Sequence, residues 1–200
     1  MSAARLTEDF YLDPDVTQVA RNLVGKVLCT RLHNQPLTAG LIVETEAYSG
    51  NNDKACHANN GTRTKRTEVM YHRGGVAYVY LCYGIHHLFN VVTNEEDHAD
   101  AVLIRAVEPV EGIDTILERR GADTLTPAVA AGPGRLTQAL GITTDHYGYD
   151  LRGEQIWIED RGSLISERSI TSSPRIGVEY AGEHAGRNWR FYVEKHAWVS

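Results

Sequence analysis

The chain has 200 residues, of which 42% are hydrophobic and 23% charged, and these values are typical of a globular protein with one domain, residues 1–200. No apolar stretch approaches the roughly 20 residues that cross a bilayer, and the first residues lack the basic flank and apolar block of a secretory signal. The formal net charge of −6 argues against an extensively basic nucleic-acid-binding protein, although a local basic cluster is compatible with DNA.

The predicted elements begin with a helix that Asp13, Pro14 and Asp15 open and Gly25 ends. Two strands follow, at residues 26–32 and 38–48, joined by a turn at residues 34–36. A polar stretch then runs over residues 49–67. It is long for a loop without regular structure, and such loops are often functional.

A strand rich in Tyr and Val is predicted at residues 76–82, and a second at 88–93, so that the two make a hairpin with Tyr83 near its tip. The remaining predicted elements are an apolar strand at 101–107, helices at 109–119 and 135–140, and short strands at 155–159, 174–180 and 189–193. Strands outnumber helices, and most connections are too short for βαβ crossovers. We therefore expect an α+β fold around a curved, mainly antiparallel β-sheet with flanking helices.

Three predicted strands carry a polar residue where a core strand is usually apolar, namely Glu46, Asn90 and Arg105. In the strand 38–48, alternation puts Glu44, Glu46 and Tyr48 on one face. Burying a carboxylate or a guanidinium is costly unless the charge is paired. Each residue alone is compatible with a solvated face, or with a structural ion pair between Arg105 and a glutamate. Together the three raise the alternative of a polar pocket.

Aromatic residues gather in the same segments, because Tyr78, Tyr80 and Tyr83 fall within one hairpin and Tyr48 closely follows Glu46. They serve either as core packing with hydroxyls at the rim, or as a slot in which a flat base stacks, at roughly 1–3 kcal/mol per base. His57 lies in the polar loop. The histidines show no HExxH or comparable spacing, so we expect no metal site.

A basic cluster, Arg63, Lys65, Arg66 and Arg73, lies in and just after the polar loop and is either a solvated surface or a DNA contact. The cysteines, Cys29, Cys56 and Cys82, are scattered and odd in number. This pattern favours reduced thiols in the cytoplasm over a disulfide framework or a zinc site.

The chain resembles the alkyladenine (3-methyladenine) DNA glycosylase family through an ordered set of motifs running from about Phe10 to the C-terminus. They are VETEAY at 43–48, ACH at 55–57, TKR at 64–66, AYVYLCYG at 77–84 followed by Asn90, VLIRAVEP at 102–109, GPGRL at 132–136, RIGV at 175–178 and RFYV at 190–193. The ordered set is highly specific. One departure is Lys65, which stands where the family commonly has proline.

The resemblance implies a monofunctional DNA glycosylase that flips alkylated or deaminated purines out of duplex DNA and hydrolyses the N-glycosidic bond, starting base excision repair. In this interpretation, Glu46 activates the attacking water and Arg105 orients Glu46. The purine lies between Tyr48 and His57 on one side and Tyr80 on the other.

The resemblance also implies that Asn90 lines the base pocket and excludes the 2-amino group of guanine, and that Tyr83 intercalates into the duplex. Arg63, Arg66 and Arg135 are candidate contacts to DNA phosphates. A bifunctional enzyme needs an amine nucleophile. The lysines weighed for that role, Lys26, Lys54, Lys65 and Lys195, lie outside the pocket motifs, so we expect no lyase activity.

The expected partner is double-stranded DNA with damaged purines, without a cofactor, a metal, a membrane or an obligate protein partner. We expect a monomer in the cytoplasm, associated with the nucleoid. Two alternatives stay open. One is a non-catalytic module that binds damaged DNA, and the other is a purine nucleosidase acting on free nucleosides.

Overall fold

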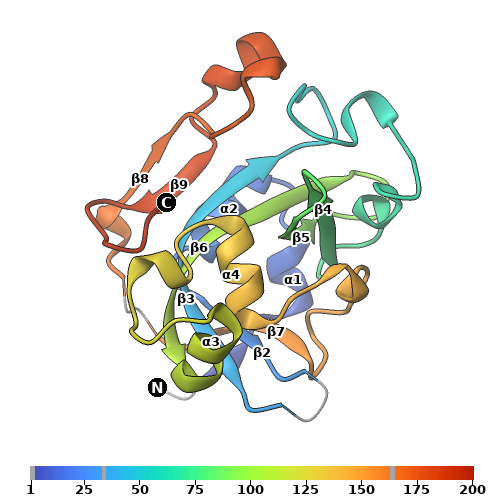
Figure 1. The fold of residues 1–200 in the computed structure, drawn as a ribbon. Helices are drawn as coiled ribbons and strands as arrows, with labels where there is room; N and C mark the ends of the chain where they lie inside the picture. The colour runs from blue at the N-terminus through green and yellow to red at the C-terminus, as the bar shows by residue number, and fades with distance from the viewer. Residues whose placement is uncertain (1–2, 33–34, 163–164) are drawn as a thin grey trace.

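The computed structural model in Figure 1 describes residues 3–32, 35–162 and 165–200. Its described part is an α+β fold around one sheet, as the sequence predicted. The sheet has the order β1-β7-β2-β3-β6-β5-β4, with β9 paired to β3 and β8 paired to β9. The strand pairings are antiparallel. Because β3 pairs with β2 along its first half and with β9 along its second, the sheet divides at this strand.

The strands are β1 (Ala4–Arg5), β2 (Val27–Thr30), β3 (Thr38–Tyr48), β4 (Ala77–Cys82), β5 (His86–Thr93), β6 (Asp100–Glu111), β7 (Ile156–Asp160), β8 (Ile170–Ser173) and β9 (Arg190–Val193). The α-helices are α1 (Glu8–Tyr11), α2 (Val16–Leu23), α3 (Ile113–Arg120) and α4 (Pro133–Leu140). Short 3₁₀ helices complete the fold: η1 (Asn59–Gly61), η2 (Glu68–Tyr71), η3 (Pro127–Val129), η4 (Thr144–His146), η5 (Glu167–Ser169) and η6 (Glu179–Gly186).

Helix α2 starts where the Asp15 carboxylate accepts hydrogen bonds from the backbone N–H groups of Thr17 and Gln18, which satisfies donors that a helix start leaves free. Its apolar side is buried against β3 and β6. The Thr45 hydroxyl faces the same helix and donates to the Ala20 carbonyl at 2.7 Å. Since side chains alternate along a strand, this contact directs Glu44 and Glu46 to the other face of β3.

Two predicted elements differ from the structure. The helix predicted at 109–119 begins at Ile113, because β6 continues through Pro109, which lies opposite Gly40 beside a register shift. A proline is tolerated where pairing is irregular. The strand predicted at 174–180 is wrong. The paired strand is β8, four residues earlier, and Gly177, with φ of 74°, turns the chain away. The predicted turn at 34–36 lies partly outside the described residues.

Close approach of β3 and β6 depends on Gly40, because a Cβ atom there would lie 2.6 Å from Val107 Cγ2 and 2.7 Å from Val107 Cβ. We predict that Gly40→Ala lowers the free energy of unfolding by about 1–3 kcal/mol in urea denaturation, since overpacking forces the strands apart. Gly186→Ala is the control, because an added Cβ there meets no atom within 4 Å. Equal stability of the two variants would contradict the packing argument.

Candidate active site

The strand register brings residues distant in sequence into one row on one face of the sheet. Tyr78 on β4 lies opposite Asn90 on β5, and Asn90 lies opposite Leu103 on β6. Leu103 in turn lies opposite Glu46 on β3, and Glu46 opposite Arg190 on β9. Directly opposed residues of antiparallel strands share a face. The row therefore places the predicted acid and the predicted pocket amide on either side of a single leucine.

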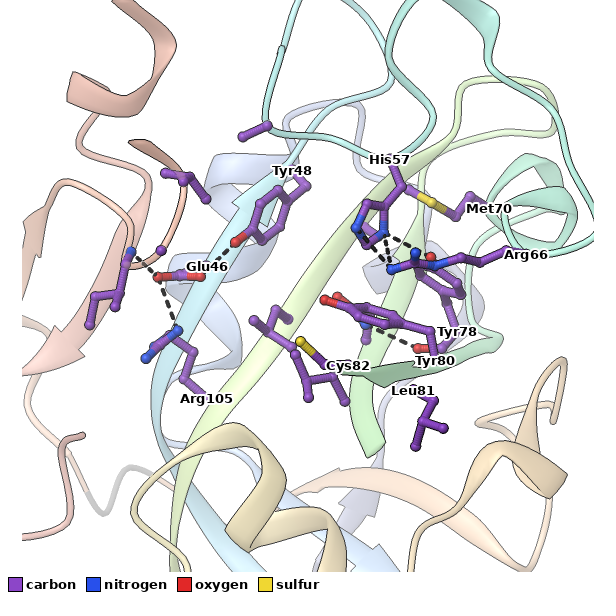
Figure 2. Close-up of a pocket in the computed structure, with 18 of the residues that line it drawn as sticks. Glu46, Tyr48, His57, Arg66, Met70, Tyr78, Tyr80, Leu81, Cys82 and Arg105 are labelled. Atoms are coloured by element: carbon purple, nitrogen blue, oxygen red, sulfur yellow. Dashed lines mark hydrogen bonds and ion pairs between the residues drawn. The ribbon is translucent and has the colours of Figure 1, made fainter. Parts of the chain in front are cut away.

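A cavity of about 380 Å³ opens over this row, within the usual size range of small-molecule sites. Its lining includes all six residues predicted to be catalytic or to form the base pocket: Glu46, Tyr48, His57, Tyr80, Asn90 and Arg105. Figure 2 shows Tyr48 on one side of the cavity and His57 with Tyr80 on the other. The structure thus brings the catalytic candidates and the base-pocket candidates into one hollow.

Glu46 is fully buried, and its carboxylate has three partners (Figure 2). The Tyr48 hydroxyl donates to Oε2 at 2.7 Å, and the Ile176 backbone N–H donates to Oε1 at 2.8 Å. Arg105 Nη1 lies 3.4 Å from Oε1. Burial and the adjacent Glu46 charge raise the pKa of Tyr48, so its hydroxyl keeps the proton that it donates. These contacts fix the direction of the carboxylate beside the cavity.

Glu44 holds Arg105 in place, a role that sequence analysis did not assign. Its Oε1 accepts from Arg105 Nε at 2.9 Å and from Arg190 Nε at 2.6 Å. Its Oε2 accepts from the Ser200 backbone N–H at 2.7 Å and from the Ser200 hydroxyl at 2.8 Å. The alternation of Glu44 and Glu46 in β3, which puts both on one face, could have indicated this role from the sequence. Arg105 both forms the structural ion pair and lines the cavity, so the two interpretations left open by the sequence occur together.

His57 is packed against Tyr80 rather than set beside Tyr48. The His57 and Tyr80 rings meet edge to face with centroids 4.8 Å apart, and no base fits between them. The predicted arrangement, with Tyr48 and His57 on the same side and Tyr80 opposite, is therefore wrong for His57. His57 Nδ1 lies 2.9 Å from the Tyr78 hydroxyl, which orients the ring.

The charge of Arg66 reaches His57 directly, because Arg66 Nη2 lies 3.1 Å from His57 Nε2. Since a guanidinium can only donate, Nε2 accepts and the imidazole is neutral. Burial, together with the smaller effect of the Arg66 charge, lowers the pKa of His57 to about 4. The cavity wall that His57 forms with Tyr80 thus carries a neutral histidine at physiological pH.

A buried ion pair that sequence analysis missed supports Tyr48, which lies across the cavity from His57 and Tyr80. Arg175 Nη1 and Nη2 donate to the two oxygens of Asp53 at 2.6 and 2.8 Å, and both side chains are fully buried. The Arg175 guanidinium lies 4.7 Å from the Tyr48 ring centroid. The pair ties the polar loop to the C-terminal segment behind Tyr48. In the sequence, only the RIGV motif, which begins at Arg175, drew attention to a member of this pair.

The hairpin residues show a buried amide and an exposed tip. Asn90 is buried, and its Nδ2 donates to the Tyr78 carbonyl at 3.1 Å. Tyr83 is 93% exposed at the turn between β4 and β5, with φ of 51° in the left-handed region. Ile85 beside it is 71% exposed. The structure therefore presents an apolar projection next to the cavity.

The three arginines predicted to contact phosphates have different surroundings. Arg63 pairs with Glu68 at 2.9 Å and with Asp97 at 3.0 Å. Arg66 lines the cavity, and Arg135 Nη1 donates to the Ala131 carbonyl at 3.2 Å. Their contact with phosphate stays a prediction.

Other sequence expectations concern metals, thiols and membranes. Over residues 3–32, 35–162 and 165–200, no group of three or more His, Cys, Asp or Glu side chains is placed to hold a metal ion. The three cysteines are free thiols, as predicted. Among the helices described, none has the length and apolar character needed to traverse a bilayer.

Comparison with known proteins identifies the class that this fold and site represent, the DNA glycosylases that hydrolyse N-glycosyl bonds. The sequence model of the methylpurine-DNA glycosylase family matches residues 9–197. Because the match spans nearly all of the chain, the protein belongs to the methylpurine-DNA glycosylase family, as its motifs predicted.

Curated relatives agree with this assignment. A protein of Chlamydia abortus (strain DSM 27085 / S26/3) is 46% identical over 189 residues, which cover 94% of this chain and 97% of the relative. A protein of Bacillus cereus (strain AH820) is 43% identical over 198 residues, covering 95% and 96%. Both carry the assigned name 3-methyladenine DNA glycosylase.

The lowered pKa of His57 predicts a pH dependence of stability. Between pH 6.5 and about 4, the unfolded chain binds a proton at His57 that the folded protein resists. The free energy of unfolding therefore falls as the pH drops through this window, by up to about 3 kcal/mol from this group. We predict that His57→Gln removes this part of the pH dependence, measured by urea denaturation at several pH values. His98→Gln, at an exposed histidine, should retain it. An unchanged slope in His57→Gln would refute the assignment.

Proposed function

We propose that this enzyme flips alkylated or deaminated purines out of double-stranded DNA and hydrolyses their bond to deoxyribose, with Glu46 as the general base. The observation that carries the proposal is the Glu46 carboxylate, buried at 0% exposure yet lining an open cavity and fixed by Tyr48, Ile176 and Arg105. A buried acid is costly, and here its site faces the space that a ligand would fill.

The chemistry follows from the position of this carboxylate. As the bond between the base and C1′ breaks, its electron pair leaves with the base and the sugar becomes oxocarbenium-like. The negative charge of Glu46 stabilises that sugar. Water then forms the new bond to C1′, and its proton passes to Glu46. The products are the free base and an abasic site.

Arg105 is proposed as a positioning residue for Glu46 and for the attacking water. Its Nε is held by Glu44 at 2.9 Å, which leaves Nη1 facing Glu46 at 3.4 Å. Because Glu44 compensates much of its charge, Arg105 can orient the acid without a full opposing cation beside the developing positive sugar.

The flipped purine is proposed to stack in the space between Tyr48 on one wall and the packed pair of His57 and Tyr80 on the other. Stacking of a base on an aromatic ring contributes roughly 1–3 kcal/mol. Asn90 lines the same cavity, and its Nδ2 donates a hydrogen bond to the Tyr78 carbonyl. A fixed amide of this kind disfavours the additional 2-amino group of guanine.

Extrusion of the purine requires a group that fills the gap in the duplex, and Tyr83 is proposed for this role. Flipping costs a few kcal/mol, and inserted aromatic or apolar side chains offset the lost stacking. Tyr83 is the most exposed large hydrophobic residue of the described chain and adjoins the cavity.

Cleavage of the DNA strand would need an amine in reach of C1′. No lysine is among the described residues that line the cavity. We therefore propose simple hydrolysis without lyase activity. The substrate, duplex DNA, would place a cytoplasmic enzyme at the nucleoid.

The proposed function predicts release of hypoxanthine and 3-methyladenine from duplex oligonucleotides, with abasic sites left behind and no release from free nucleosides. Glu46→Gln should lower single-turnover excision by about 10²–10⁴-fold, since the amide cannot accept the proton, while binding to damaged duplex persists. Glu118→Gln, at an exposed glutamate of α3, should retain full activity.

Each alternative gives its own result in this assay. A non-catalytic module would bind the damaged duplex without base release by the unaltered protein. A nucleosidase would release the base from free nucleosides. Near-normal turnover by Glu46→Gln would remove Glu46 from its role while leaving the reaction class intact.

A second prediction concerns the exposed tip. Tyr83→Ala should reduce the flipping equilibrium by roughly tenfold, because the vacated stack is no longer filled. Fluorescence of an ethenoadenine in the duplex reports this equilibrium. Val110→Ala, another exposed apolar residue, at the far end of β6, is the control and should flip normally. Normal flipping by Tyr83→Ala would reject the intercalating role.

A further inference from the structure

Arg66 presents an uncompensated positive charge to the base slot. Its guanidinium lies 4.5 Å from the Tyr80 ring centroid, and its Nη2 lies 3.1 Å from His57 Nε2. Both contacts are to neutral groups on the same wall of the cavity. Figure 2 shows Arg66 reaching across this wall to His57.

The other arginines near the slot are compensated. Arg105 pairs with Glu44 at 2.9 Å, and Arg175 pairs with Asp53 at 2.6 Å. For Arg66, no carboxylate among residues 3–32, 35–162 and 165–200 lies within ion-pair distance. A charge without a paired counter-ion acts over a longer distance than a paired one.

Arg66 is close enough to His57 for its charge to act on the imidazole, since Nη2 lies 3.1 Å from Nε2. The Arg66 charge adds to burial in lowering the pKa of this imidazole to about 4. Protonating His57 and admitting a cationic purine both add a positive charge next to the same guanidinium. The field that opposes the first therefore opposes the second.

Damaged purines differ in this property. The nucleotides of 7-methylguanine and 3-methyladenine carry a positive charge on the base, whereas hypoxanthine and ethenoadenine are neutral. An aromatic wall normally attracts a cation through its ring electrons. On Tyr80, however, the guanidinium of Arg66 already makes that interaction.

Bond cleavage responds to the same charge. The electron pair of the broken C1′–N bond leaves with the purine. A cationic purine thereby becomes neutral, so the fixed cation opposes its entry into the slot rather than its departure. A neutral purine becomes negative unless it takes up a proton, so a fixed cation nearby favours its departure.

We propose that Arg66 is a specificity-determining residue that disfavours cationic purines and favours neutral ones in the base slot. The inference rests on the proposed function and adds to it the charge class of the preferred lesion. For Arg66 it is an alternative to the sequence-based expectation of a phosphate contact, and the test below separates the two.

The test compares single-turnover excision of 7-methylguanine and hypoxanthine from otherwise identical duplexes, with spontaneous loss of 7-methylguanine subtracted. In Arg66→Met, which keeps a flexible stem without the charge, the ratio of 7-methylguanine to hypoxanthine excision should rise about tenfold. Arg66→Lys keeps the charge and should stay near the original ratio. Lys65→Met removes the neighbouring exposed cation, which does not line this cavity, and should leave the ratio unchanged.

Each result decides the matter. Equal loss of both activities in Arg66→Met would make Arg66 a general DNA contact and overturn the inference. A falling ratio would mean that Arg66 supports cationic bases and would also overturn it. If the unaltered protein releases both bases but Arg66→Met keeps the original ratio, the inference alone fails. If the unaltered protein releases neither base, the proposed function fails, and the inference fails with it.

Discussion

Burial of two carboxylates, two residues apart on β3, is the constraint on which the rest of the site depends. A buried carboxylate is tolerated only with charged or hydrogen-bonding partners. Glu44 and Glu46 share Arg105, and Glu44 also accepts from Arg190 and Ser200. Those partners come from β6, β9 and the C-terminal segment. Compensating two acids therefore draws three distant parts of the chain to one point.

The two tyrosines on either side of the cavity, Tyr48 and Tyr80, are themselves positioned by charged neighbours. Tyr48 donates to Glu46 and has the Asp53–Arg175 pair behind its ring. Tyr80 has His57 at its edge and Arg66 near its face. The net charge of −6 is that of the whole chain, whereas Arg66 borders the slot without a carboxylate partner among the residues that the structure describes. Composition alone therefore misjudges the electrostatics that a bound base would meet.

Alternation and turn signals predicted the α+β class, the hairpin and the shared face of Glu44 and Glu46, because these features depend on local periodicity. The extension of β6 past Pro109 was not predictable, since it requires a bulge opposite Gly40 that only pairing reveals. Residues 174–180 alternate like a strand, but Arg175 is drawn to Asp53, 122 residues away in sequence. The packing of His57 on Tyr80 likewise depends on how the polar loop folds back. Contacts between distant segments do not produce a periodic pattern in the sequence, so they could not be predicted from it.

The register row across β4, β5, β6, β3 and β9 has a consequence for how the family can diversify. Hydrogen-bonded strands hold Glu46 and Asn90 in fixed positions, so small backbone shifts there would disturb the hydrolysis proposed for this site. His57 and Arg66 instead belong to a loop, where exchanges are tolerated. If the proposed roles hold, lesion preference can change through loop substitutions while the residues proposed for hydrolysis, which lie on the sheet, stay the same.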